Sequence, residues 1–284
     1  MKKILFMLLC AATAQAQREV QFAQYLVNPM AINPAYAGAR ETFHFNAVLR
    51  RQWIAGIQGL PVTPSFAMDG SVANGKIGLG LQGLNDRFNF NTAVFGTIAY
   101  HYNISETQKI SVGALGGINA LPVLGFANKI LASAGVGVYY EDENYFGGIS
   151  MPEILKQTAM YPSGLLDYQR PVFVQAGAKL FLNDDLELRP SVLLTKPEQG
   201  KIRADLNALA RFKEKVTVGT SIRFGSTSYW QGIAQYDLSK NFRVGYVYSS
   251  KRVEGDSPGI PSATSGAGRG IHELVITLQP NPQQ

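Results

Sequence analysis

Alternation of apolar and polar residues at period two runs along nearly the whole chain and constrains the fold more than any other feature. In "KVTVGTSIRF", Lys215 to Phe224, valine, isoleucine and phenylalanine occupy one face, while Lys, Thr, Gly, Ser and Arg occupy the other. The segments that begin at Lys76, Val172, Leu186 and Phe242 repeat the pattern. Such alternation is typical of β-strands with one apolar face, so the chain is predicted to be all-β.

About fourteen segments qualify as strands, and the mature chain of 268 residues then gives about 19 residues for each strand with its connection. A transmembrane β-strand needs roughly 9 to 11 residues, so this spacing suits a transmembrane antiparallel β-barrel. The predicted strands are 42–53, 64–72, 76–85, 90–104, 109–119, 130–141, 144–151, 170–182, 186–195, 201–212, 215–225, 229–238, 242–250 and 271–279.

A soluble β-sandwich also alternates and is the competing architecture. Polar faces that carry Lys, Arg and Glu continue across more strands than a two-sheet core needs, and the other faces are rich in Val, Leu, Phe and Tyr. Behind the N-terminus, no apolar run approaches the roughly 20 residues of a membrane-spanning helix. A barrel of the outer-membrane type is therefore favoured.

The connections predict a topology. Short polar segments at 141–146, 182–188, 212–216 and 237–244 have the Asn, Asp and Lys content of hairpin tips and are predicted to be periplasmic turns. The longer segments that start at Met151 and Lys251 are predicted to be extracellular loops. An even number of strands puts both chain termini on the periplasmic side.

The first sixteen residues, "MKKILFMLLCAATAQA", have the basic start, apolar stretch and Ala-x-Ala ending of a cleavable secretory signal. A lipoprotein signal at Cys10 is the alternative, but the large Leu9 before it argues against this. Removal of 1–16 leaves no cysteine, which excludes disulfide-stapled folds and thiolate metal sites. The mature chain has 24 basic and 20 acidic residues, or +4, dispersed without a basic stripe, so no nucleic-acid partner is predicted.

Neither a catalytic nor a metal-binding pattern occurs in the sequence. His44, His101 and His272 are far apart in sequence and form no ligand pair, and no Gly-x-Ser-x-Gly or other nucleophile signature occurs. The glycine-rich "GLGLQG" and "GALGG" are followed by no crossover helix, so they are interpreted as strand glycines, useful where a barrel curves or inward side chains crowd. No catalytic residue, metal site or cofactor is predicted. A barrel hydrolase, which would need Ser and His on neighbouring strands, remains a distant alternative.

Three motifs carry a family resemblance. They are "QFAQYLVNPMAINPAYAGA" from Gln21, "RRQWIAGIQGLPVT" from Arg50 and "GRGIHEL" from Gly268. In this order and spacing they resemble the PorP/SprF family of Bacteroidetes outer-membrane proteins, and weaker agreement extends over essentially the whole mature chain. The chain departs from the family in its compact loops after Leu155 and Lys251 and in "GRGIHE", where serine is common before the histidine.

The resemblance implies a FadL-like barrel of about fourteen strands in the outer membrane, tied to type IX secretion and gliding motility, and no enzyme. Implied partners are outer-membrane lipids, the periplasmic ring lipoprotein, peptidoglycan-linked components and, in some members, a cognate secreted adhesin. A FadL-like channel for hydrophobic or small solutes is the runner-up function.

The segment 17–41 lies between the signal and the barrel, which is predicted to span 42–284. It is long enough to cross a barrel lumen, where irregular backbone is tolerated because protein or water satisfies its polar groups. A periplasmic rim segment is the equal alternative. Its aromatic residues are predicted anchors, its prolines are expected to fix extended turns, and its asparagines to supply local hydrogen bonds. The candidate partner-binding or structural residues are Gln21, Phe22, Gln24, Tyr25, Asn28, Pro29, Asn33, Pro34, Tyr36, Gly38, Arg51, Gln52, Trp53, Pro61, His272 and Glu273.

Overall fold

The structure is a computed structural model that describes residues 23–54, 62–86, 91–122, 128–161, 164–167, 170–225, 228–250 and 269–280, with only the backbone described for a few of them. Its strands are β1 His44–Ile54, β2 Val62–Val72, β3 Ile77–Asp86, β4 Asn91–Asn103, β5 Lys109–Pro122, β6 Asn128–Glu141, β7 Tyr145–Met151, β8 Thr158–Tyr161, β9 Gly164–Asp167, β10 Val172–Ala178, β11 Leu180–Asn183, β12 Leu186–Lys196, β13 Arg203–Phe212, β14 Val216–Phe224, β15 Tyr229–Ser239, β16 Phe242–Ser249 and β17 Arg269–Leu278. Three 3₁₀-helices precede them: η1 Ala23–Leu26, η2 Pro29–Ala31 and η3 Pro34–Tyr36.

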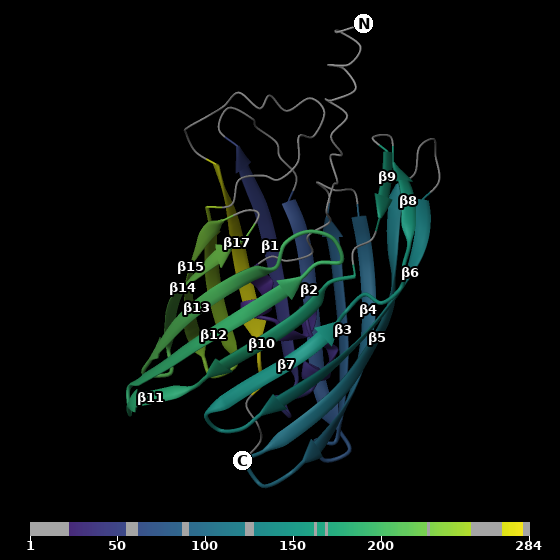
Figure 1. Ribbon diagram of the computed structural model, residues 1–284. Coiled ribbons are helices and arrows are strands. Elements are labelled where there is room, and N and C mark those ends of the chain that lie inside the picture. Colours follow the sequence, from purple (N-terminus) through teal and green to yellow (C-terminus); the bar gives the residue numbers. More distant parts are fainter. Residues whose placement is uncertain are drawn as a thin grey trace, which may run out of the picture.

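The main sheet closes into an antiparallel barrel (Figure 1). Neighbours along the chain pair with each other, β1 pairs with β17, and β10 pairs with both β7 and β12. Since β10 and β11 are two parts of one barrel strand, both paired with β12, the barrel has fourteen strands. The predicted fold class is confirmed, and each predicted strand ends within three residues of its position in the structure.

Two details differ from the sequence prediction. The predicted strand 170–182 is interrupted at Lys179, so that β11 continues as a short piece paired only with β12. The predicted loop after Met151 contains a small separate hairpin, β8–β9. Alternation alone does not reveal either feature, because a break and a two-strand hairpin both keep period two.

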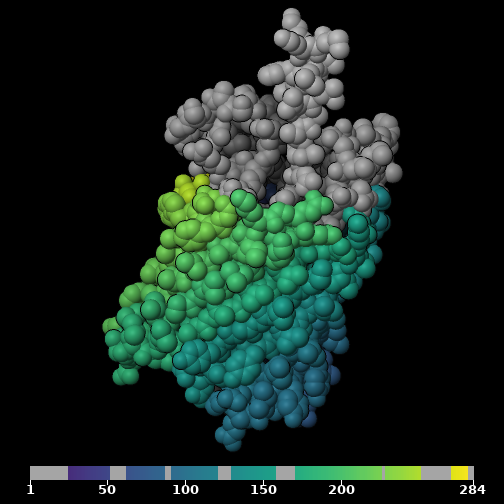
Figure 2. All heavy atoms as spheres, viewed as in Figure 1, coloured from purple at the N-terminus to yellow at the C-terminus, as the bar shows by residue number. Residues whose placement is uncertain are grey.

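The polar faces of the strands point inward and the apolar faces outward. On β14, Thr217, Ser221 and Arg223 are buried, whereas Ile222 and Phe224 are exposed. This arrangement inverts the usual burial pattern of a soluble protein and matches a barrel whose outer wall meets lipid. The strands run diagonally across the outer wall, as Figure 2 shows for the face in view.

The two ends of the barrel differ. At the end called here the turn end, the lower end in Figure 1, β1 begins, β17 ends and the short connections lie. The β13–β14 turn there has positive φ at Lys213 and Glu214, the backbone of a tight hairpin, which confirms the turn predicted at 212–216. The other end, the loop end, holds the longer connections.

Candidate functional site

Residues 23–41, called here the plug, lie inside the barrel. Met30, Ala35 and Ala37 have no measurable exposure, and Asn33 is 1% exposed. The segment is therefore among the most buried parts of the described chain. The 3₁₀-helix η3 packs against β4, β5 and β6, and hydrogen bonds link the plug to β2, β4, β6, β7 and β13.

Prolines start two of the plug's short helices. Pro29 begins η2 and Pro34 begins η3, where a missing N–H costs nothing because no carbonyl would accept from it. The extended backbone expected around these prolines is found at Asn33, the residue before Pro34, whereas each proline itself starts a 3₁₀ turn. The side chain of Asn33 accepts from the N–H of Ala35 at 3.0 Å and caps η3, whereas Asn28 makes no side-chain capping bond. The predicted local hydrogen bond is present at one asparagine of the two.

One side of the inner wall is built from glycine, called here the glycine wall. It consists of Gly78 and Gly80 on β3, Gly113 on β5, Gly137 on β6 and Gly148 on β7. A Cβ on Gly113 would overlap the backbone of Ala35, and one on Gly137 would overlap the side chain of Asn33. Glycine is needed at these positions because the plug comes directly against the strands, with its backbone at Gly78 and Gly113 and with its side chains at the other three.

Polar contacts anchor the plug along the same side. Asn33 Nδ2 donates to the carbonyl of Val138 at 3.0 Å, and the hydroxyl of Ser150 donates to the carbonyl of Ile32 at 2.7 Å. These bonds satisfy plug and strand groups that water cannot reach. The chain then leaves the lumen through Gly38, whose φ of +70° favours glycine and whose N–H donates to Asp69 at 2.9 Å.

His101 has a structural role at this exit. Its Nε2 lies 2.9 Å from the carbonyl of Ala37 and its Nδ1 lies 2.6 Å from the hydroxyl of Ser111. A carbonyl can only accept, so Nε2 carries the proton and Nδ1 accepts from the serine. The imidazole thus ties the plug to β4 and β5.

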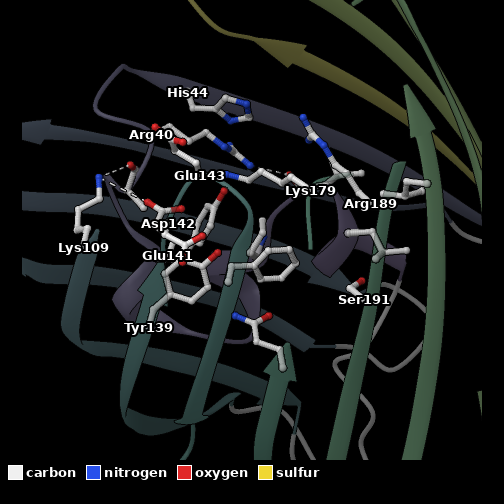
Figure 3. Close-up of a pocket in the computed structure, with 18 of the residues that line it drawn as sticks. Arg40, His44, Lys109, Tyr139, Glu141, Asp142, Glu143, Lys179, Arg189 and Ser191 are labelled. Atoms are coloured by element: carbon white, nitrogen blue, oxygen red, sulfur yellow. Dashed lines mark hydrogen bonds and ion pairs between the residues drawn. The ribbon is translucent and has the colours of Figure 1, made fainter. Parts of the chain in front are cut away.

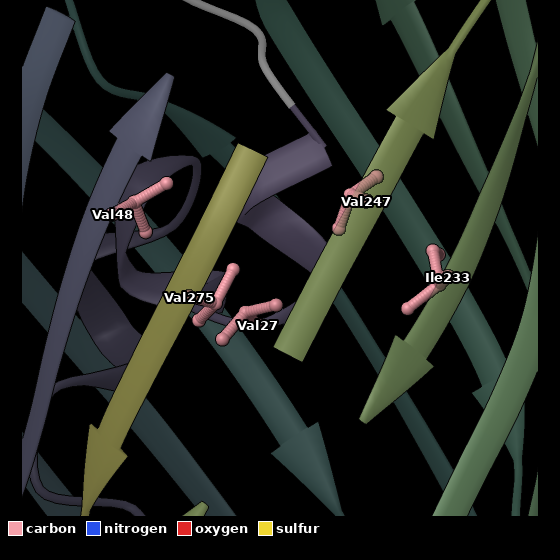
Figure 4. Packing of buried hydrophobic residues seen from close by; sticks show 5 residues of the cluster. All are labelled: Val27, Val48, Ile233, Val247 and Val275. Carbon is pink, nitrogen blue, oxygen red and sulfur yellow. The ribbon is translucent and has the colours of Figure 1, made fainter. Parts of the chain in front are cut away.

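Apolar side chains hold the opposite side of the plug. Val27 packs against Val48, Ile233, Val247 and Val275, which point inward from β1, β15, β16 and β17 (Figure 4). The sequence analysis missed these residues. Their signal is an apolar residue on the otherwise polar face of a strand, which alternation treats as noise.

Tyr25 makes both apolar and polar contacts with the barrel wall. Its ring packs with Ile32, Phe173 and Leu193, and its hydroxyl donates to Asn207 Oδ1 on β13 at 3.0 Å. Burial, with the nearby Asp205 carboxylate, raises the pKa of Tyr25 well above its usual range, so the hydroxyl stays a donor.

Tyr36 anchors the lower part of the plug. Its ring meets that of Tyr139 edge to face at 5.2 Å, and the guanidinium of Arg40 lies 5.2 Å from the centre of the Tyr36 ring. Arg40 also donates to the carbonyl of Val27 at 3.4 Å and so joins two parts of the plug.

Below the plug, a cavity of about 610 Å³ lies at the turn end; it is called here the vestibule (Figure 3). Plug residues Tyr25 and Arg40 form part of its lining. Its charges are largely paired: Lys109 lies 3.1 Å from Glu41 and 3.5 Å from Glu141. On the far side Arg189, Arg211 and Arg243 pair with Glu187 or Asp237. A polar, mixed-charge mouth differs from the mostly apolar pockets that hold small molecules.

The second and third motifs meet at the closing seam of the barrel, because β1 pairs with β17. Arg50 and Glu273 lie opposite each other, point inward and form a buried ion pair at 3.5 Å. Arg51 and His272 are also opposite but face outward, where the Tyr246 hydroxyl bonds His272 and the Tyr248 ring lies 5.3 Å away. Of the two neighbouring arginines, the sequence analysis therefore selected the outward Arg51 and missed the inward Arg50, which binds Glu273.

The remaining predicted residues are only partly described. Gln21, Phe22 and Pro61 lie outside the described residues. For Gln24 in η1 and for Gln52 and Trp53 in β1 the structure describes the backbone alone.

Within the described part of the chain, no three His, Cys, Asp or Glu side chains are grouped so as to hold a metal ion. None of the described helices is long and apolar enough to cross a membrane.

Solved structures with a similar fold are outer-membrane channels. The Ralstonia pickettii toluene transporter TbuX has a TM-score of 0.51 and 11% identity, with 93% of this chain and 95% of that chain covered. The monoaromatic hydrocarbon channel CymD has a TM-score of 0.50 and 10% identity, with 95% of each chain covered. The TodX deltaS2S3 mutant monoaromatic hydrocarbon channel has a TM-score of 0.52 and 11% identity, with 91% of this chain and 94% of that chain covered. At such identities the likeness shows the FadL-like fold alone.

Comparison with curated protein sequences gives no match. The family described as type IX secretion system membrane protein PorP/SprF matches residues 14–277. Together with the barrel fold, this match places the protein in the outer membrane, and both family and fold are of non-enzymatic types. The chain therefore belongs to the PorP/SprF family of type IX secretion system membrane proteins.

Proposed function

We propose that this barrel is an interaction component of the type IX secretion and gliding machinery, which supports export or surface attachment of a secreted adhesin without catalysing a reaction. The observation that carries the proposal is the plug. Residues 23–41 occupy the lumen and bond to both sides of its wall, through Asn33 on one side and Tyr25 on the other. A barrel filled in this way serves as a rigid support for partners.

A channel for hydrophobic solutes is the second candidate, favoured by the fold shared with a toluene transporter and a monoaromatic hydrocarbon channel. Such a channel needs a continuous apolar path. The inward positions here include buried Asn46, Thr97, Asn119 and Ser133, and the inward valines pack against the plug. These features support the interaction function over the channel.

In this proposal the turn end faces the periplasm, as the short turns and the even strand number favour. The plug leaves the lumen at that end through Gly38, beside the vestibule. Both features would be within reach of the periplasmic ring lipoprotein and peptidoglycan-linked components, which are the partners proposed for this chain.

Affinity purification from native outer membranes tests the proposal. The parent is compared with a triple variant of the plug, Tyr25→Ala, Asn33→Ala and Tyr36→Ala, and with a control, Tyr102→Ala and Tyr236→Ala, whose tyrosines are 59% and 48% exposed. We expect secretion components to co-purify with the parent and the control and to be lost from the plug variant. Heat-modifiable mobility on gels checks that every variant forms a barrel.

Either of two results would reject the proposal: a parent that co-purifies with no secretion component, or a plug variant that keeps all partners and adhesin export. Uptake of a radiolabelled monoaromatic hydrocarbon into cells that carry the parent, and not into cells without it, would favour the channel.

A further inference from the structure

The short strand β11, Leu180–Asn183, is an open edge of the sheet at the rim of the turn end. The last backbone bond on its β7 side runs from Lys179 N to Asn144 O at 2.7 Å. Beyond it, among the pairings of the described strands, β11 has β12 alone as a neighbour. Its hairpin projects from the side of the barrel, at the lower left in Figures 1 and 2.

The edge offers backbone hydrogen bonds. In an antiparallel strand, both polar backbone groups of one residue point to the same side, and the side alternates along the chain. Lys179 uses its N–H toward β7, so Phe181, two residues further on, turns its N–H and C=O to the open edge. The register then shifts between Phe181 and Asn183, which ends the edge.

Apolar side chains cover both faces of this edge. Leu180 and Leu182 lie on the outward face and are 38% and 60% exposed. Phe181 lies opposite Glu187 of β12. Its side chain is on the lumenal face of the strand and is 66% exposed. Burial of leucine and phenylalanine side chains stabilises a complex, so three in a row form a strong docking feature.

Lipid explains only part of this surface. Hydrocarbon could cover Leu180 and Leu182 but not Phe181, which is on the opposite face. Unpaired backbone groups are also too costly to place in hydrocarbon, so the open edge lies outside the membrane core. An occupant that satisfies both the backbone and the two apolar faces is another β-strand.

Charge indicates the composition of that strand. Exposed Glu143 lies in the turn beside the edge, and exposed Asp184 and Asp185 form the tip of the β11–β12 hairpin. The nearby cations include Lys179, Lys213, which lies 3.8 Å from Asp185, and Arg189, which is paired with Glu187. The surroundings are thus mildly acidic.

We propose that β11 docks an extended segment of a periplasmic partner protein by strand addition, and that this segment has alternating apolar residues flanked by Lys or Arg. The inference deepens the proposed function and rests on it, since it assigns the surface through which a secretion component binds. Docking places the partner beside the vestibule and leaves the plug untouched.

The test removes the edge donor without changing the barrel. Phe181→Pro deletes the one N–H that faces the open edge, and Phe181→Ser removes only the side chain. The control is Leu238→Ser, also at the turn end and 57% exposed. In quantitative affinity purification from native outer membranes, we expect one periplasmic protein to fall by about tenfold with each Phe181 variant and to remain with the control.

A photo-crosslinking residue at Glu143 identifies the bound segment. We expect it to form an adduct with the depleted protein, at an alternating apolar stretch with Lys or Arg at its ends, and the adduct to vanish in the Phe181→Pro background. The inference is overturned if the Phe181 variants keep every partner, if crosslinks join two copies of this chain, or if they reach lipid alone. A parent without any secretion partner would instead reject the proposed function itself. Should Phe181→Pro fail to form a heat-modifiable barrel, Phe181→Ser decides the matter.

Discussion

The two sides of the lumen hold the plug in different ways. On β3 and β5 the glycine wall brings strand backbone against plug backbone, on β6 and β7 it meets the Asn33 side chain, and the bond from Asn33 to Val138 fixes the register. On β1, β13 and β15 to β17 the contacts are made by side chains, as with Val27 in its valine cluster and Tyr25 on Asn207. Backbone contacts cannot rearrange as side chains can, so the glycine wall sets the position of the plug and the other side only complements it.

The largest effect is expected when a side chain is introduced into the glycine wall. Gly113→Val should displace η3, because a Cβ there overlaps the backbone of Ala35. Overpacking costs typically 1 to 3 kcal/mol, and we expect about 3 kcal/mol or more here because backbone must move. The measurement is protease accessibility of the plug in detergent-solubilised barrels, with unfolding in urea for the free energy.

Gly116→Val is the matched control for that substitution. Gly116 lies three residues further along β5, and a Cβ there has nothing within 4 Å. It should leave the plug protected. If both variants expose the plug equally, the effect comes from β5 itself and the glycine wall has no special role.

The second prediction concerns the bond that sets the register. Asn33→Ala removes the cap on η3 and the bond to the Val138 carbonyl, each worth about 1 kcal/mol, so the plug should lose about 2 kcal/mol of stability. Asn28→Ala is the control, since Asn28 makes no capping bond. Hydrogen exchange of the plug amides measures both. Equal protection in the two variants would mean that the wall holds the plug by shape alone.

The barrel strands could be predicted from the sequence, but the position of the plug and the role of the glycine wall could not. Strands of the barrel follow from local alternation, and so does the inward polar face. The glycines of "GLGLQG" and "GALGG" are interpreted from the sequence as strand glycines, useful where a barrel curves or inward side chains crowd, because nothing local shows that Gly113 faces another chain segment. The plug's place in the lumen depends on contacts such as Tyr25 with Asn207, 182 residues apart, which no local pattern encodes.

Some features were nonetheless visible in the sequence. Val48, Ile233, Val247 and Val275 are apolar residues on polar faces, and four such exceptions on neighbouring strands indicate a buried contact inside the barrel. The run Leu180–Leu182 breaks alternation at a strand end, where the structure shows an open edge. Departures from the dominant pattern were thus more informative about function than the pattern.

The third prediction tests the apolar side of the lumen, where Val27 packs against β1 and β15 to β17. Val247→Ala leaves a cavity against Val27 and should cost about 2 kcal/mol, from the lost burial and the void together. We expect faster exchange of amides near Val27 but normal protection near Asn33, because the glycine wall still fixes the register. Val218→Ala, on an outward side chain that is 40% exposed, serves as the control. Equal loosening at Val27 and Asn33 would show that both sides act as one unit.

The smallest effect is expected at the hydroxyl of Tyr25. Tyr25→Phe keeps the ring in its apolar contacts and removes the bond to Asn207, which should cost about 1 kcal/mol. Burial raises the pKa of this hydroxyl in the folded protein, so its stabilising effect is present below the ordinary tyrosine pKa of about 10 and is lost as the pH rises above that value. Urea unfolding between neutral and strongly alkaline pH should therefore show a steeper loss for the parent than for Tyr25→Phe, with Tyr100→Phe, 51% exposed, behaving like the parent. Parallel pH profiles for Tyr25→Phe and the parent would mean that the ring alone, and not the hydroxyl, holds this side of the plug.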